Sequence, residues 1–441
     1  MSRPQKILYS LGAIGTALSY QAFSTYILFF YVDTMKLATH LAAIAMLVYG
    51  LWNALNDPLF GFLSDRTRTP FGRRIPYIAL GAVPFGIIYF LLWIPPFNST
   101  QTIPLFLYFL SFICLFDGFY SIVVLNWASL YPEMFSSLTE RASVNSLRQF
   151  FGVVGLIIGI SLPPLIYSSI GWGGMGLIFG CIISLAFIVS LLGCREKKEL
   201  SSVKPLGILQ AFSATLKNRS FLTFVISNLF IQYTFMMVLA IIPFYAKYVL
   251  GVGPKWTSAI LLSAFILEMP MLFVWGRLAV RFGAKRIYMI AIALFAVFLL
   301  PFFFLKAAPF AAAAAALLGT ALGGVIVLSD VLISDVIDED EIKTGRRREG
   351  MYFGINAFVT RFAIALEAAS IGGIFILTGY NPNVLSQTGS FLMGLRFLIA
   401  GLPMLSMAAA FVIMMYYPLE GENFERVKAK GPRIMKTSDL S

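Results

Sequence analysis

The stretch LWNALNDPLFGFLSDRTRTPFGRR, residues 51–74, begins as an apolar helix and ends in a strongly basic loop. Within it, Asp57 lies roughly four to five helical turns into an apolar run that starts near Leu41. Pro58 removes a backbone donor directly after Asp57, which can leave a carbonyl oxygen free for coordination. If this run crosses a membrane, a carboxylate there costs a few kcal/mol, so Asp57 is a candidate functional residue.

The composition predicts a membrane protein. Of the 441 residues, 59% are hydrophobic and only 12% are charged, whereas soluble domains carry about 25% charged residues. The N-terminal apolar segment continues to about Val32, which is too long for the core of a signal peptide, and we interpret it as a first membrane helix. One histidine, His40, and three cysteines without CxxC spacing offer no catalytic, redox or metal-binding arrangement. We therefore expect neither an enzyme nor a protein with a metal or another cofactor.

The apolar segments predict an all-α integral membrane protein. A spanning helix needs about 20 apolar residues, and we count twelve such segments. The first six lie at about 7–32, 41–63, 75–95, 103–131, 142–167 and 173–193. The second six lie at about 221–246, 256–276, 287–305, 308–336, 351–378 and 392–417.

The longest polar stretch separates the sixth segment from the seventh. The predicted domains are an N-terminal six-helix bundle (1–194), a cytoplasmic linker (195–220), a C-terminal six-helix bundle (221–418) and a cytoplasmic tail (419–441). The second and eighth segments end alike, with GFLSDRTRTPFGRR at 61–74 and GRLAVRFGAKR at 276–286. Such internal repeats are typical of transporters, which bind substrate near the membrane midplane between the repeats.

The lysines and arginines predict the orientation. Of 33 in total, 26 fall on one side of the predicted membrane, four fall on the other, and three lie in or at the ends of helices. This bias predicts a multi-pass protein of the plasma membrane with both termini in the cytoplasm. It also accounts for the net charge of +12 without a nucleic-acid partner.

The polar residues around Asp57 suit a monovalent cation. Asn53 and Asp57 are four residues apart and share one face of the helix, with Asn56 beside them. Two amide oxygens, a carboxylate and a hydroxyl from the fourth segment could coordinate Na⁺. The carboxylate could also take a proton, and because a lone carboxylate in a low-dielectric setting favours its neutral form, we lean slightly towards H⁺. The alternative is a structural pair between Asp57 and an arginine.

Further charged residues occur inside the predicted helices. Arg148 and Arg361 lie in the fifth and eleventh segments, one in each half. A guanidinium cannot lose its charge in lipid, so each must face a carboxylate, water or substrate. We expect Arg361 to face the central cavity near Arg148 and Glu268, where it would bind an anionic substrate. The alternative is an internal salt bridge of Arg361 with Glu268 or Glu367. We interpret Asp117 as a structural partner, for instance of Arg148.

The basic loop after the second segment predicts a gate at the cytoplasmic face. We expect the loop to lie beside the eleventh segment or the loop before it, where charge pairs, with Glu133, Arg141 and the acidic run 338–341 as partners, would hold that face closed in the outward-open state. The candidate gate residues are Asp65, Arg66, Arg73, Arg74, Glu133 and Arg141.

Four stretches of the chain resemble one family. They are KILYSLGAIG (6–15), NDPLFGFLSDRTRTPFGRRIPY (56–77), YSIVVLNWASLYPEMF (120–135) and DVIDEDEIKTGRRREGMYFGINAFVTRF (335–362). The chain resembles, over essentially its whole length, the glycoside–pentoside–hexuronide:cation symporters of the major facilitator superfamily, in their melibiose-permease-like form. The resemblance implies twelve transmembrane helices in two six-helix bundles, and no enzymatic activity.

The resemblance also implies roles for individual residues. The two acids of the family's cation site fall on Asn53 and Asp57, with Asn56 retained between them and a hydroxyl position at Ser121. The family's acids that bind sugar fall on Ala17 and Val124, which puts a galactoside-type pocket in doubt. The substrate-binding candidates are Tyr20, Asn126, Trp127, Arg148, Glu268, Asn356 and Arg361.

The predicted function is cation-coupled symport of a sugar, glycoside or hexuronide by alternating access. Because the two acids that bind sugar are missing and two arginines, Arg148 and Arg361, are available, an anionic substrate such as a uronide is favoured within this class. The alternatives are a lipid, lysolipid or other organic-anion transporter of the same fold, a membrane enzyme that acts on lipid, and a sensor without transport. The expected partners are a small-molecule substrate, H⁺ or Na⁺ and the lipid bilayer, and we expect a monomer.

Overall fold

The computed structural model of the protein describes residues 3–135, 138–195, 217–344, 349–384 and 386–419. A few side chains within these ranges, including those of Asp65 and Arg141, lie outside the described set. The described chain is helical throughout and contains no strand in these ranges. An all-α protein is what the apolar segments predicted.

The helices follow the predicted segments closely. The N-terminal part contains α1 (Arg3–Ser10), α2 (Gly12–Leu28), the π-helix η1 (Phe29–Thr34), α3 (Thr39–Arg66), α4 (Ile75–Leu91), α5 (Thr102–Tyr120), the π-helix η2 (Ser121–Leu125), α6 (Asn126–Met134), α7 (Leu138–Ser161) and α8 (Pro163–Leu191). The C-terminal part contains α10 (Arg219–Phe244), the π-helix η3 (Tyr245–Val249), α11 (Pro254–Phe282), α12 (Ala284–Leu299), the 3₁₀-helix η4 (Leu300–Phe303), α13 (Ala308–Thr344), α14 (Glu349–Leu377), α15 (Gly389–Arg396), the π-helix η5 (Phe397–Gly401) and α16 (Leu402–Met415).

Nine helical runs in the described ranges are long and apolar enough to cross a membrane. Each of the twelve predicted segments overlaps helical structure, and the count of twelve crossings stays a prediction. The end of the fifth predicted segment differs from the structure, because α7 ends at Ser161 and α8 begins at Pro163. The helix breaks only at Gly171 within α8, where φ is 77°. The fifth predicted segment therefore continues into the first turns of α8.

The chain forms two compact units, as far as the structure describes it. The first comprises Met1–Val203, Leu239–Leu262 and Ile364–Leu398, and the second comprises Lys204–Val238, Ser263–Ala363 and Ile399–Ser441. The first unit thus contains the N-terminal part, the end of α10, the start of α11, the end of α14 and the whole of α15. The predicted division into two six-helix bundles stays a prediction.

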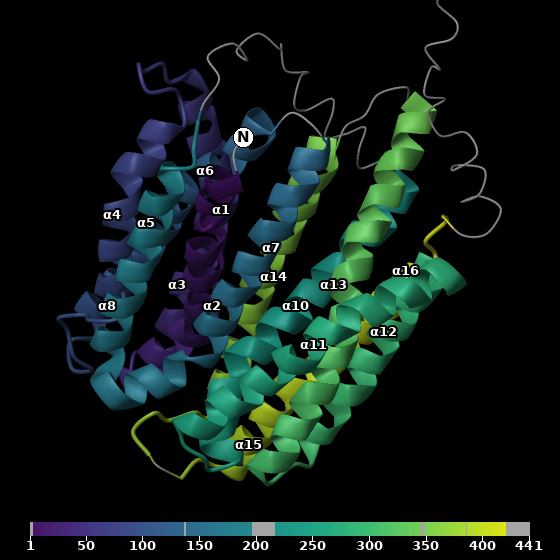
Figure 1. The fold of residues 1–441 in the computed structure, drawn as a ribbon. Coiled ribbons are helices and arrows are strands. Elements are labelled where there is room, and N and C mark those ends of the chain that lie inside the picture. Colours follow the sequence, from purple (N-terminus) through teal and green to yellow (C-terminus); the bar gives the residue numbers. More distant parts are fainter. Residues whose placement is uncertain (1–2, 136–137, 196–216, 345–348, 385, 420–441) are drawn as a thin grey trace, which may run out of the picture. The chain divides into compact units, whose positions relative to one another are not determined.

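Small residues bring the helices of the first unit into close contact. A Cβ added at Gly86 on α4 would lie 2.4 Å from the carbonyl oxygen of Gly180 on α8, and one at Gly180 would lie 2.4 Å from the carbonyl oxygen of Gly86. Along α2 and α7, which contact each other (Figure 1), a Cβ at Gly155 would lie 2.6 Å from Ile14 O. These glycines let the backbones touch, as small residues do in membrane proteins.

The second unit is built around α13. This helix packs against α12, and α12 also packs against α16. A Cβ added at Gly319 on α13 would lie 1.8 Å from the carbonyl oxygen of Ala264 on α11, so these two helices also touch through their backbones. Trp275 Nε1 of α11 donates to Thr320 O at 2.7 Å, which ties the same pair of helices further along.

Candidate functional site

The predicted cation-site residues meet between α3 and η2. Asn53, Asn56 and Asp57 extend from α3, and Ser121 is the first residue of η2, which continues α5. Ser121 Oγ lies 3.1 Å from Asn56 Oδ1 and 2.5 Å from Asp57 Oδ1. Carboxylate, amide and hydroxyl oxygens from three residues therefore converge. Hard cations prefer such oxygen ligands in proteins.

A second carboxylate, Asp117 on α5, belongs to the same group. Its Oδ1 accepts a hydrogen bond from Asn53 Nδ2 at 2.7 Å, and its Oδ2 accepts one from Asn56 Nδ2. Because Asp117 is 1% exposed, these charge-assisted bonds are made away from water. Both amide nitrogens turn towards Asp117, so the amide oxygens turn away from it. We call Asn53, Asn56, Asp57, Asp117 and Ser121 the α3–α5 polar cluster.

The sequence analysis missed the place of Asp117 in this cluster. We interpreted it as a partner of Arg148, and the structure places it against two amides of α3. Asp117 and Ser121 are four residues apart, the same spacing that puts Asn53 and Asp57 on one face. That spacing is the signal that could have placed Asp117 beside the cation site.

Arg148 on α7 lies over two aromatic rings. Its guanidinium carbon is 4.6 Å from the ring centre of Trp127 and 4.8 Å from that of Tyr131, within the range of cation–π contacts. Its Nε is buried and makes no hydrogen bond within the described part of the chain. The aromatic rings thus hold the guanidinium, and its Nε faces no acceptor among the described residues.

Trp127 and Asn126, two predicted substrate residues, are packed inside the first unit. Trp127 Nε1 lies 3.1 Å from Tyr9 O and 2.9 Å from Ser190 Oγ, and its ring stacks on Tyr9 at 5.1 Å. With Arg148 over it as well, Trp127 is only 2% exposed, and Asn126 is fully buried. In this conformation neither side chain reaches a surface where it could touch a solute. Trp127 positions Arg148 in this conformation, and the substrate-binding role of Trp127 and Asn126 stays a prediction.

The remaining predicted substrate residues lie in different parts of the chain. Tyr20 on α2 is half-buried, with its ring 5.8 Å from that of Tyr120. Glu268 and Arg361 are half-buried residues of the second unit. Glu268 Oε2 is buried without a hydrogen-bond partner among the described residues. The expected closeness of Arg361 to Arg148, which belongs to the first unit, stays a prediction.

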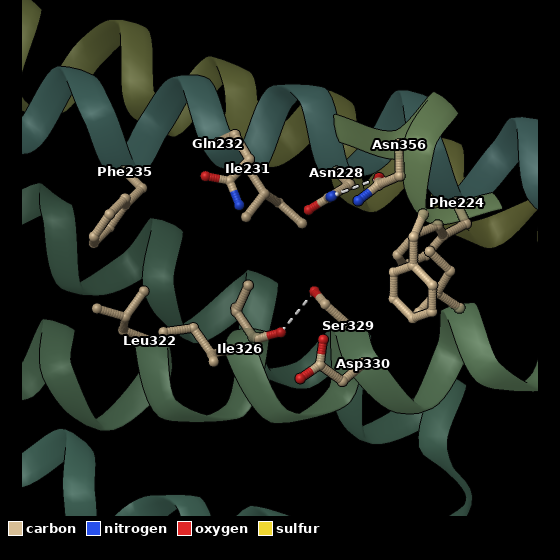
Figure 2. Close-up of a pocket in the computed structure, with 13 residues that line it drawn as sticks. Phe224, Asn228, Ile231, Gln232, Phe235, Leu322, Ile326, Ser329, Asp330 and Asn356 are labelled. Carbon is tan, nitrogen blue, oxygen red and sulfur yellow. Dashed lines mark hydrogen bonds between the residues drawn. The ribbon is translucent and has the colours of Figure 1, made fainter. Parts of the chain in front are cut away.

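Asn356 lines a cavity of about 240 Å³ in the second unit (Figure 2). The cavity lies among α10, α13 and α14. Asn228 and Gln232 of α10 lie on one side with Asn356 of α14, and Asp330 of α13 lies opposite them (Figure 2). Asn228 Nδ2 donates to Asn356 Oδ1 at 2.9 Å. The cavity therefore offers several polar groups to a solute within one unit.

A sequence profile for the family described as MFS/sugar transport protein matches residues 8–421. The chain belongs to this family. The predicted major facilitator fold and the predicted class of membrane transporter are thereby confirmed. The transporter is a multi-pass membrane protein and not an enzyme.

Three similar proteins show how the transporter compares. A putative sulfoquinovose importer of Escherichia coli K12 is 29% identical over 99% of the transporter and 96% of its own chain. The sodium-dependent lysophosphatidylcholine symporter 1-A of Danio rerio is 22% identical over 95% of the transporter and 86% of its own chain. The crystal structure of a D-xylose-proton symporter matches with a TM-score of 0.69 at 14% identity, covering 94% of the transporter and 98% of that chain. The last comparison shows a shared fold alone.

A polar cluster that the sequence analysis did not predict surrounds Asp33 of the transporter, in η1. Asp33 is 3% exposed and accepts from Lys247 Nζ at 2.5 Å, from the Tyr248 hydroxyl, and from the Tyr380 hydroxyl at 2.9 Å. Lys36 Nζ also donates to the carbonyl oxygen of Pro382. We call Asp33, Lys247, Tyr248 and Tyr380 the Asp33 cluster. It joins the end of the first predicted membrane segment to those of the seventh and eleventh, within the first unit.

The basic loop of the transporter makes ion pairs with the end of α6. Arg73 Nη2 and Arg74 Nε lie 2.6 Å and 2.9 Å from Glu133 Oε1. Arg66 is exposed, and the side chains of Asp65 and Arg141 lie outside the described residues. The loop is thus held to its own half, and the predicted role of this group as a gate stays a prediction.

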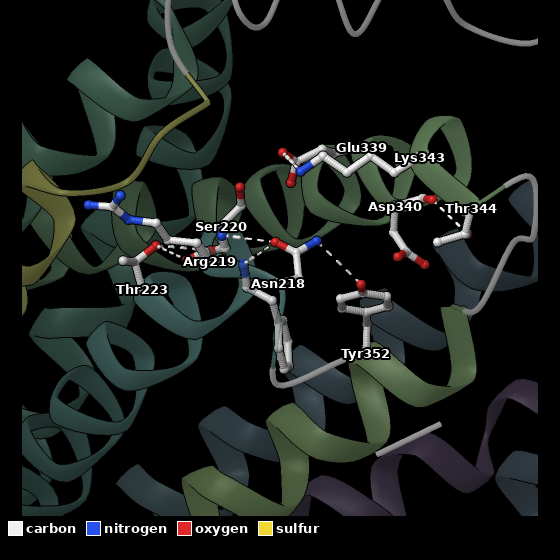
Figure 3. Close-up of polar contacts among 10 residues, drawn as sticks. Asn218, Arg219, Ser220, Thr223, Glu339, Asp340, Lys343, Thr344 and Tyr352 are labelled. Carbon is white, nitrogen blue, oxygen red and sulfur yellow. Dashed lines mark hydrogen bonds and ion pairs between the residues drawn. The ribbon is translucent and has the colours of Figure 1, made fainter. Parts of the chain in front are cut away.

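The acidic end of α13 carries local polar contacts (Figure 3). Glu339 is buried and pairs with Lys343 at 2.5 Å. Beside it, Asn218 Oδ1 accepts from Ser220 N at 2.9 Å, which caps the start of α10. Asn218 Nδ2 is 3.4 Å from the hydroxyl of Tyr352 on α14. The Asn218–Tyr352 bond ties the start of α10 to α14, two of the helices that enclose the cavity, and the Glu339–Lys343 pair lies within α13.

Proposed function

We propose that the transporter couples the movement of a sugar-type solute to Na⁺, and that the α3–α5 polar cluster is the Na⁺ site. The observation that carries this proposal is the convergence of Asp57 Oδ1, Asn56 Oδ1 and Ser121 Oγ. Asp57 supplies the ligand charge. Asp117 positions the amides by accepting from both of their nitrogens. A site whose oxygens are already turned to one point loses little conformational entropy when a cation binds.

Two carboxylates support Na⁺ over H⁺. Our preference for H⁺ assumed that Asp57 was the single negative charge of the site. Asp117 adds a second carboxylate, and both of its oxygens accept hydrogen bonds from amides. A network with two negative charges attracts a bare cation more strongly than a network with one. The sodium dependence named for the Danio rerio relative, which is 22% identical, agrees with this choice.

We propose a sugar, glycoside or hexuronide as the solute. The family description and the sulfoquinovose importer support a sugar, and the permanent positive charge of the half-buried Arg148 side chain supports an anionic group on it. A lysolipid is the second candidate because of the Danio rerio relative. The cavity of the second unit supports the sugar, since three amides, a hydroxyl and a carboxylate lie among its apolar lining residues.

The proposal also covers the membrane in which the transporter lies, the side on which its termini lie and its oligomeric state. The distribution of lysines and arginines supports a plasma-membrane location with both termini in the cytoplasm. We propose that a monomer is the working unit, because the α3–α5 polar cluster and the cavity are each formed within a single chain.

The coupling proposal is tested with purified protein in sealed proteoliposomes. Uptake of labelled glucuronate, xylose and methyl glucoside is measured with a Na⁺ gradient alone and with a pH gradient alone, in native protein and in Asp57→Asn. We expect accumulation with Na⁺ alone in the native protein. In Asp57→Asn we expect accumulation to be lost while downhill exchange continues.

Three results would count against the proposal. Accumulation that needs only a pH gradient would overturn the choice of Na⁺. Full accumulation in Asp57→Asn would remove Asp57 from coupling. Uptake of lysophosphatidylcholine but of none of the sugars would replace the solute by the second candidate.

A further inference from the structure

We propose that the cavity among α10, α13 and α14 binds a neutral, hydroxyl-rich sugar ring of the solute, with Asp330 and Gln232 as its main polar contacts. This inference rests on the proposed function and adds a binding site to it. The cavity lies wholly within the second unit and is about 240 Å³ in volume. Small-molecule sites are commonly about 300–1,000 Å³, so this cavity suits one ring and not a lipid chain.

The polar wall offers the donors and acceptors that vicinal hydroxyls need. Asp330 is exposed to the cavity, and its carboxylate can accept from two neighbouring hydroxyls. Gln232 is half-buried on the opposite side (Figure 2) and provides both a donor and an acceptor. Asn228 and Asn356 bond to each other at 2.9 Å, which fixes how the pair presents its remaining polar atoms. A ring placed between the two walls could bond to both.

The aromatic and aliphatic lining of the cavity suits the C–H groups of a sugar. Phe224, Phe235 and Phe353 line the cavity together with aliphatic side chains. Phe353 is 48% exposed, although it is a large apolar residue. A sugar ring carries C–H groups that pack on aromatic rings while its hydroxyls bond to polar groups on either side. This combination of flat apolar surface and few, well-placed polar groups is typical of specific ligand sites.

The charge of the lining residues determines whether the cavity binds an anionic, a cationic or a neutral group of the solute. None of its lining residues, all of them described, is Lys, Arg or His. An anionic group would meet the Asp330 carboxylate without a compensating cation, and that arrangement is unfavourable. A quaternary ammonium would pair with Asp330 but leave the donors and acceptors of Asn228, Gln232 and Asn356 unused. A neutral polyol uses all of them.

The test compares equilibrium binding in matched variants. Native protein is titrated with glucose, galactose, xylose, methyl glucoside, glucuronate and choline, and the tightest-binding sugar is then used throughout. We expect Asp330→Asn and Gln232→Leu to raise Kd at least tenfold, because each loses hydrogen bonds to the sugar. Gln101→Leu, at an exposed position before α5, makes the same chemical change outside the cavity and should leave Kd unchanged.

Deoxy sugars separate contact from a merely structural effect. Removing one hydroxyl from the sugar should weaken binding to the native protein. For at least one hydroxyl of the ring, we expect the sugar and its deoxy analogue to bind Asp330→Asn with the same Kd. This lack of additivity identifies the hydroxyl that Asp330 contacts. If Asp330→Asn cannot be purified, Gln232→Leu with the same analogues gives the test.

The outcomes distinguish this inference from the proposed function. Unchanged Kd in both cavity variants, with Na⁺-driven uptake retained, overturns the cavity and leaves the transport proposal in place. Choline binding that is tighter than that of every sugar and is lost in Asp330→Asn overturns the sugar assignment. If no sugar binds and none is carried, the proposed function and the inference both fail.

Discussion

Asp117 shows how one buried side chain can orient two others. An asparagine at position 117 would present one acceptor and one donor, so one of the two amides, Asn53 or Asn56, would have to turn round. We expect Asp117→Asn to raise the Na⁺ concentration for half-maximal uptake about tenfold, because a hydrogen bond to a charged group contributes about 1.5–3 kcal/mol. The measurement is the Na⁺ dependence of uptake at constant pH. A Na⁺ dependence equal to that of the native protein would show that Asp117 does not act on the site.

Trp127 gives a second prediction for a single side chain. Its Nε1 lies within hydrogen-bond distance of Tyr9 O and Ser190 Oγ, and Trp127→Phe would leave both buried acceptors without this donor. The indole N–H is one buried donor shared by the two acceptors, and its loss costs about 1–3 kcal/mol, so we expect a lower melting temperature and weaker uptake through a displaced Arg148. Trp52→Phe is the matched control, since Trp52 Nε1 has a single acceptor, Cys114 O. Equal melting temperatures for the two variants would contradict the expectation.

Spacing along the chain predicted part of this chemistry and could not predict the rest. Asn53 and Asp57 could be placed on one face because four residues make about one helical turn. The burial of Trp127 could not be predicted, because its partners Tyr9 and Ser190 lie 118 and 63 residues away. The spacing of residues along the sequence shows which face of a helix a side chain lies on. It does not show which distant residues pack against that face.

Between helices, the contact of α4 with α8 is limited by backbone atoms. A Cβ at Gly180 would lie 2.4 Å from the carbonyl oxygen of Gly86, and a carbonyl cannot move aside as a flexible side chain can. We expect Gly180→Ala to destabilise the protein by about 1–3 kcal/mol, the usual cost of overpacking. Gly152→Ala on α7 is the control, because nothing lies within 4 Å of a Cβ there. Thermal unfolding of both purified variants checks this, and similar curves would refute it.

The helices were predictable because their apolar runs are long. Their ends were less so. The predicted end of the fifth segment, near residue 167, falls inside α8, where Pro163 and Pro164 begin a new helix and Gly171 makes the turn. The two prolines and the glycine are visible in the sequence as possible helix ends. Because the residues on both sides are apolar, the sequence does not show at which of them the membrane helix ends.

Across the first unit, the Asp33 cluster joins parts of the chain that are more than 200 residues apart. Asp33 is buried, so removing its charge leaves the Lys247 ammonium without its counter-charge and weakens the contact. We expect Asp33→Asn to let this end of the helices open more often. The readout is a cysteine at Ala42, which is 1% exposed, in protein whose own three cysteines have been replaced. Its reaction with a membrane-impermeant maleimide should become several-fold faster in Asp33→Asn.

A cysteine at Ser99, in the exposed connection between α4 and α5, should react at the same rate in both proteins. An unchanged rate at position 42 would mean that the Asp33 cluster does not hold this end closed. No local pattern could predict the cluster from the sequence. Asp33, Lys247 and Tyr380 each lie at the end of a different apolar run, where a single charge or a tyrosine is common.

The paired glycines of α4 and α8 have a consequence for how the sequence can drift. At most contacts, a larger residue on one side can be offset by a smaller one on the other, and the two positions then vary together among relatives. Gly86 and Gly180 each meet the other's main chain, which is the same whatever the side chain, so no exchange at one can rescue a change at the other. Both positions should therefore stay fixed in a mutational scan. Methods that infer proximity from correlated variation will find no signal at the point where these two helices are closest.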